Sequence, residues 1–61
     1  MSVAMHFADL EAVYEKLATA IDAAGADKAP VYLTKLVLLL SDQVGDPPKV
    51  LHAIDECLHD L

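Results

Sequence analysis

The longest apolar run of the chain, residues 36–40, lies near its middle and contains four leucines and one valine. The run belongs to a longer segment, residues 30–45, in which apolar positions recur with helical spacing. An α-helix turns about 100° per residue, so five consecutive residues point to every side of it. A helix that is apolar all round is covered on more than one side. We therefore predict a central helix over residues 30–44 that packs against other segments on at least two faces.

Residues 7–24 have the spacing of an amphipathic helix. The apolar positions that follow the i, i+3, i+4, i+7 pattern are Phe7, Leu10, Val13, Tyr14, Leu17 and Ile21. They share an arc of about 120–160°, which is typical of a surface helix with one covered face. We expect Asp9 to be the N-cap of this helix and Gly25 to end it.

Proline and glycine mark the boundaries of the other two helices. Asp27 or Ala29 is predicted to cap the second helix, and Pro30 is tolerated in its first turn because the missing N–H would be unpaired there. Gly45 is predicted to end the second helix in a left-handed conformation. Asp46 is then predicted to cap a third helix over residues 47–59.

The third helix has one apolar arc, formed by Val50, Leu51, Ile54, Leu58 and Leu61. The sequence has no alternation typical of strands and no internal repeat. Three helices joined by short links predict an all-α, three-helix up-down-up bundle. We assign residues 7–61 to this single domain and residues 1–6 to a flexible N-terminal arm.

The central helix carries apolar residues on two sides. Val31 and Leu38 lie nearly opposite its main apolar stripe, which consists of Leu33, Leu36, Val37, Leu40 and Val44. Either the third helix of the same chain covers Leu38, or Leu38 packs against another chain together with Tyr32 or Leu39. A chain of about 60 residues buries only about 60% of its unfolded surface, whereas 56% of these residues are hydrophobic. Cys57 is the only cysteine, so no internal disulfide can compensate. We predict that homodimerisation completes the bundle, through an interface formed by Val31, Tyr32, Leu38 and Leu39.

The charge of the chain narrows the choice of partner. Ten acidic residues against four basic ones give a formal net charge of −6. Nucleic acids and anionic membrane surfaces both attract cationic proteins, so neither is an expected partner. The expected partners are a second copy of the chain or a larger protein. The sequence has no apolar run of about 20 residues, and we expect no signal peptide because residues 1–6 lack a basic region followed by a long apolar stretch. With its lone thiol, the protein is expected to be cytoplasmic.

One cluster of side chains has the spacing of a metal site. His52, Glu56 and His59 lie four and three residues apart, so one face of the third helix presents all three. The inward positions of the other helices are apolar or alanine, so a solvated polar face is the simpler interpretation. A small metal-binding protein stays an alternative hypothesis. We identify no catalytic or cofactor-binding residue, because the chain has no glycine-rich phosphate loop and no Ser/His/Asp set. We therefore expect a non-enzymatic helical interaction module.

Several short segments carry a resemblance to a known family. They are Asp9-Leu10, Val13-Tyr14, Leu17, residues 36–40 and Gly45-Asp46-Pro47. With these residues the chain, from about Phe7 to Leu61, resembles a family of short bacterial proteins catalogued as domain of unknown function 2783. The family has no assigned activity, so the resemblance implies a fold and no catalytic residue. Its members look like companions of aromatic-degradation genes. The resemblance thus implies an alternative role as an accessory protein of a flavin-dependent aromatic hydroxylase.

Overall fold

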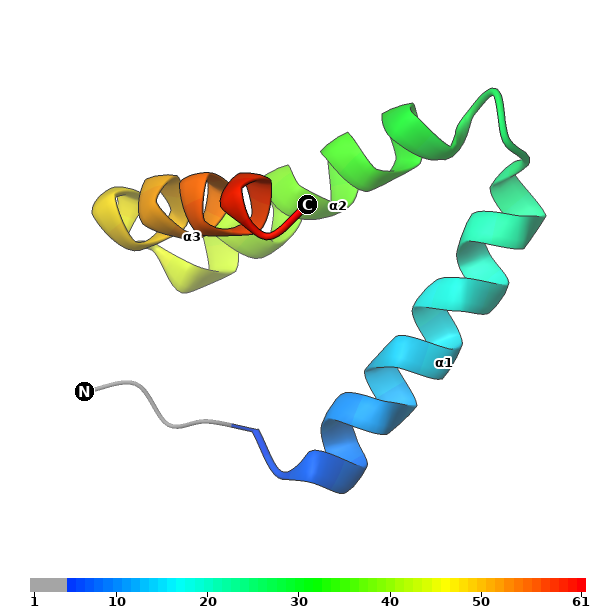
Figure 1. Cartoon of the computed structure of the whole chain (residues 1–61), viewed down its shortest axis with the longest axis horizontal. Coiled ribbons are helices and arrows are strands. Elements are labelled where there is room, and N and C mark those ends of the chain that lie inside the picture. Colours follow the sequence, from blue (N-terminus) through cyan, green and yellow to red (C-terminus); the bar gives the residue numbers. More distant parts are fainter. Residues whose placement is uncertain (1–4) are drawn as a thin grey trace.

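The computed structural model describes residues 5–61 and contains three helices in this part of the chain, with no strand (Figure 1). The first helix, α1, spans Phe7–Ala24, the second, α2, spans Ala29–Val44, and the third, α3, spans Pro47–His59. The all-α class and the number of helices are therefore as predicted. Of the predicted N-terminal arm, residues 1–4 lie outside the described residues. Met5 and His6 precede α1 and are exposed.

The start of α1 differs from the prediction. The N-cap is His6, which has an extended backbone and whose side chain makes no capping hydrogen bond. Asp9, the predicted cap, lies in the first turn, where its charge is favourable at the positive end of the helix dipole. The carbonyl of His6 accepts hydrogen bonds from the N–H groups of Asp9 and Leu10, each at 3.0 Å. These bonds begin the helix without a side-chain cap.

The turn between α1 and α2 is closed by backbone groups alone. Gly25 ends α1 as predicted, with φ 87° and ψ 155°, a conformation outside the left-handed helical region. The carbonyl of Gly25 accepts hydrogen bonds from the N–H groups of Lys28 (3.1 Å) and Ala29 (2.9 Å). The N-cap of α2 is Lys28, again with no side-chain bond, so the prediction of Asp27 or Ala29 as the cap was wrong. The N–H of Ala29, the first residue of the helix, is thus bonded to a backbone carbonyl.

The link between α2 and α3 matches the prediction. Gly45 has φ 68° and ψ 22°, which is left-handed, and its N–H donates to the carbonyl of Ser41 at 3.0 Å. Asp46 is the N-cap of α3, and its carboxylate accepts a hydrogen bond from the N–H of Lys49 at 3.4 Å. Pro47 follows in the first turn, where its missing N–H costs nothing. The link is only two residues long, so α3 starts beside the end of α2.

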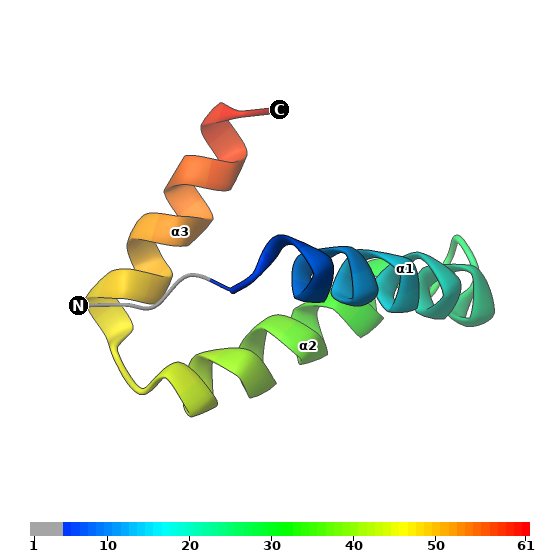
Figure 2. The same cartoon turned by 90° about the horizontal axis from the view of Figure 1, so that it is seen from below.

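Each helix packs only against its neighbour in the sequence. α1 and α2 touch near their connecting turn and diverge from there (Figure 1). The half-buried apolar residues of this contact region are Leu17, Ala20, Ile21 and Ala24 on α1 and Ala29, Tyr32, Leu33 and Leu36 on α2. Figure 2 shows α3 turning away from α2 beyond the second link. No two described residues that are twelve or more positions apart have Cα atoms within 8 Å, and α1 makes no contact with α3.

The single chain consequently has no interior. No side chain in the described part of the chain is fully buried. The accessible surface is 5626 Å², whereas a compact protein of 6.5 kDa exposes about 3,800 Å². The radius of gyration is 12.8 Å, against about 10.5 Å for a compact domain of this length. The three helices are formed, but the bundle is not closed within one chain.

Candidate protein-docking surface

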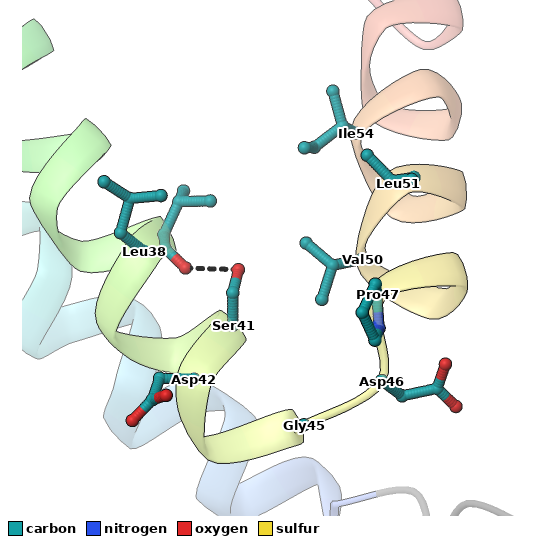
Figure 3. Close-up of a pocket in the computed structure, with 10 residues that line it drawn as sticks. Leu38, Ser41, Asp42, Gly45, Asp46, Pro47, Val50, Leu51 and Ile54 are labelled. Carbon is teal, nitrogen blue, oxygen red and sulfur yellow. Dashed lines mark hydrogen bonds between the residues drawn. The ribbon is translucent and has the colours of Figure 1, made fainter.

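An apolar groove runs between α2 and α3 (Figure 3). We call it the α2–α3 groove. Its apolar lining consists of Val37, Leu38, Pro47, Val50, Leu51 and Ile54. Leu38 lies on the α2 wall and faces Val50, Leu51 and Ile54 on the α3 wall. Two carboxylates, those of Asp42 and Asp46, lie at the end of the groove near the link.

The groove exists because the helices are joined closely but not packed along their length. The left-handed Gly45 and the cap at Asp46 place the start of α3 beside the last turns of α2. The hydroxyl of Ser41, which also lines the groove, donates to the carbonyl of Val37 at 2.6 Å (Figure 3). That hydroxyl is therefore satisfied within its own helix. Between the walls the groove offers mainly carbon to an incoming side chain.

The two walls of the groove do not cover each other. Leu38 is 65% exposed, Leu51 64% and Ile54 50%. Of the apolar residues on the α3 wall, only Val50 is half-buried. Moving one such side chain from water to full burial stabilises a protein by about 1.5–3 kcal/mol. The groove thus holds a substantial hydrophobic driving force that the chain does not use on its own.

The predicted interface residues are not gathered into one patch. Leu38 lies in the groove, whereas Val31, Tyr32 and Leu39 lie outside it. Val31 is 60% exposed and Leu39 is 57% exposed on other parts of the α2 surface, and Tyr32 is half-buried. The two alternatives for Leu38 are not exclusive, because α3 lies beside this side chain and still leaves most of it accessible.

The α3 wall of the groove is not among the interface residues predicted from the sequence. Val50, Leu51 and Ile54 were identified only as the apolar arc of the third helix. Their spacing shows that the arc needs a partner, but helical periodicity does not say whether that partner belongs to the same chain. The short link at Gly45 and Asp46 indicates where the arc lies, because a two-residue link places the start of the third helix beside the end of the second.

A second uncovered apolar surface lies on the N-terminal half of α1. We call it the α1 face; it consists of Phe7, Leu10, Val13 and Tyr14. Phe7 is 75% exposed, Tyr14 72%, Val13 51% and Leu10 50%. Further along the same stripe, Leu17 and Ile21 are half-buried. The stripe predicted for this helix is therefore covered only in its second half, where α1 is close to α2.

The polar side of α3 carries the residues that were considered as metal ligands. His52 Nε2 and Glu56 Oε1 are 3.7 Å apart, and these side chains are 80% and 74% exposed. An ion pair on such an open helical surface contributes little to stability. Within residues 5–61, no three side chains of His, Cys, Asp or Glu are placed to hold one metal ion, so His59 does not complete a site with this pair. Cys57 is exposed and its thiol is free.

None of the helices in the described region is long and apolar enough to cross a membrane. Comparison with protein-family models finds no match, and comparisons with curated proteins and with solved structures find no significantly similar chain. The family resemblance read from the residues therefore stays a prediction. The uncovered apolar surfaces are the features of the molecule that indicate a function.

Proposed function

We propose that this protein is a helical protein–protein interaction module, acting by binding rather than by catalysis, and that it assembles as a homodimer through α2. One observation carries the proposal: the chain exposes 5626 Å², about 1,800 Å² more than a compact protein of its mass. Much of the exposed side-chain surface is apolar, including the walls of the α2–α3 groove and the α1 face. Exposed contiguous apolar surface of this kind marks an interaction site.

A second copy has the right size to cover this surface. Two separate chains expose about 11,000 Å², whereas one compact protein of twice the mass exposes about 6,300 Å². A dimer with the accessible surface of that compact protein would therefore bury about 4,900 Å² in total. Obligate homodimers bury about 2,000–5,000 Å² or more in total. A homodimer thus accounts for the excess surface without a third component.

The placement of charge supports contact through the groove. Pairing doubles a net charge of −6, so like charges must stay at the rim of the interface or outside it. The carboxylates nearest the groove, those of Asp42 and Asp46, lie beside the link and point away from the space between the walls (Figure 3). The His52–Glu56 face lies on the opposite side of α3 from Ile54, since these positions differ by about 160–200° around the helix.

The proposal is tested by substituting Leu38→Glu, which places a charge in the centre of the groove. Each copy would then bury one unpaired carboxylate in the interface, which should raise the dissociation constant of the dimer at least about a hundredfold. Ala12→Glu is the matched control: it changes the net charge equally, on the polar arc of α1. Sedimentation equilibrium of the three proteins measures the dimer fraction, and circular dichroism checks that helix content is kept.

We expect the wild type and Ala12→Glu to be dimers, and Leu38→Glu to be a monomer at the same concentration. A wild-type chain that stays monomeric at high micromolar concentration would refute the homodimer. A Leu38→Glu protein that dimerises as tightly as the wild type would refute the role of this part of α2.

A further inference from the structure

We propose that, in the homodimer, the α1 face of each copy occupies the α2–α3 groove of the other copy. This inference rests on the proposed homodimer and adds the identity of the segment that fills the groove. It assigns a partner to both uncovered apolar surfaces of the chain at once. Each copy contributes one helix to its partner and accepts one in return.

The α1 face has the pattern of a helix that binds in a groove. Phe7, Leu10 and Tyr14 lie at i, i+3 and i+7, with Val13 beside them, which is the anchor spacing of amphipathic helices bound in hydrophobic grooves. All four are at least half exposed. The continuation of the stripe packs against α2 of its own chain, so the helix is held at one end while its apolar N-terminal half is left free.

The groove has the form that accepts a helix. Two helices meeting at one end leave a notch, and a third helix laid in that notch completes a three-helix bundle. In the single chain α1 does not fill this notch, since it makes no contact with α3. Exchange of α1 would complete two bundles, each built from α2 and α3 of one copy and the N-terminal half of α1 of the other.

The turn before α2 favours exchange over closure within one chain. The direction of α1 is set by Gly25, whose φ of 87° and ψ of 155° belong to a region available essentially only to glycine. Two backbone hydrogen bonds to its carbonyl, from Lys28 and Ala29, hold the turn. Closing the bundle within one chain requires a change in this turn or in the Gly45–Asp46 link. Reciprocal exchange leaves both as they are.

Reciprocity also stops the assembly at two copies. If each α1 face is seated in the groove of the same neighbour, the contact is related by a twofold axis and every uncovered surface is used. A non-reciprocal arrangement of the same contact would leave one groove and one α1 face open. It would therefore add further copies and form chains.

Disulfide trapping tests the arrangement directly. In a Cys57→Ser background, Leu10→Cys and Ile54→Cys place one thiol on the α1 face and one in the groove. A disulfide requires Cα atoms about 4.4–6.8 Å apart, and residues this distant in the sequence are not within 8 Å in the single chain. A second double variant, Glu15→Cys with His52→Cys, is the control, because both thiols then lie on polar arcs. Mild oxidation is followed by non-reducing electrophoresis and by mass analysis of the linked peptides.

We expect most of the Leu10→Cys/Ile54→Cys protein to become a covalent dimer linked between residues 10 and 54, with little covalent dimer from the control. An internal 10–54 disulfide in a monomer would show that the bundle closes within one chain, and would refute the exchange and the homodimer together. A wild type that is dimeric by sedimentation but whose variant forms no 10–54 link would refute only the placement of α1. Circular dichroism of the reduced variants confirms that the helices are retained.

Discussion

The stability of this protein should depend on its concentration, because folding and association use the same apolar surface. The lone chain exposes 5626 Å², so folding alone removes only about 40% of the surface that the unfolded chain exposes. In a dimer as compact as a single protein of the same mass, about two-thirds of the surface of the unfolded chains would be buried. Most of the hydrophobic free energy beyond the helix contacts therefore becomes available only when two copies meet. We expect unfolding to be a transition from folded dimer to two unfolded chains.

The size of the effect follows from mass action. Each tenfold increase in protein concentration raises the stability of the dimer by about 1.4 kcal/mol at the midpoint. With a urea m-value of about 1–3 kcal/mol per molar, the midpoint moves up by about 0.5–1.4 M for each tenfold step. The dimer also exposes about three times as much surface on unfolding as a lone chain does. Its m-value should exceed that of an isolated chain by a similar factor.

The assay is urea unfolding followed by circular dichroism, at concentrations from about 1 to 100 μM. Curves at all concentrations should fit one dimer dissociation-and-unfolding equilibrium. A midpoint that stays constant over the whole range would refute the coupling of folding to self-association. The Leu38→Glu protein provides the internal comparison, since its low residual stability should not vary with concentration.

Two further outcomes test other parts of the reasoning. Gly45→Ala should lower the stability by about 1–2 kcal/mol per chain and Gly45→Asn by less, because asparagine adopts the left-handed conformation more readily. At Gly25, whose conformation is open essentially only to glycine, the alanine and asparagine substitutions should each lower the stability by about 1–3 kcal/mol. Urea midpoints measured at one fixed protein concentration compare the four variants. Raising the salt concentration from about 20 mM to 0.5 M should tighten the dimer several-fold, because screening reduces repulsion between two acidic chains; weaker association at high salt, measured by sedimentation, would instead indicate an interface held by ion pairs.

The helices could be predicted from the sequence because their boundaries depend on local signals. α3 has both predicted ends, α1 ends where predicted but is capped three residues earlier, at His6, and α2 begins at Ala29, one residue before the prediction. Gly45 and Asp46 act as predicted, because a left-handed glycine and a capping aspartate work within a few residues. The caps at Asp9 and Asp27 were mispredicted. α1 begins before Asp9, which therefore lies inside its first turn, and the carbonyl of Gly25 accepts hydrogen bonds from the N–H groups of Lys28 and Ala29 at the start of α2.

The arrangement of the helices could not be predicted in the same way, because helical periodicity says which side of a helix is apolar and not what covers it. The stripe on α1 was read as one continuous covered face, yet Leu10 and Val13 are left about half exposed where α1 leaves α2. The groove was foreseen only through Leu38. The residues of its α3 wall are predicted from the sequence only as an apolar arc, with no partner assigned to them.

Leu38 shows why packing within the chain and packing between chains are hard to separate here. Its neighbours Val50 and Ile54 belong to the same chain, but they flank it without enclosing it, so the side chain stays 65% exposed. Any segment that covers Leu38 must also cover the α3 wall, and thereby holds α3 against α2. The groove would then become an interior only in the complex. A substitution in the groove should therefore lower both the stability of the fold and the affinity of the dimer, because the same contacts serve both. A substitution on the polar arcs should lower neither.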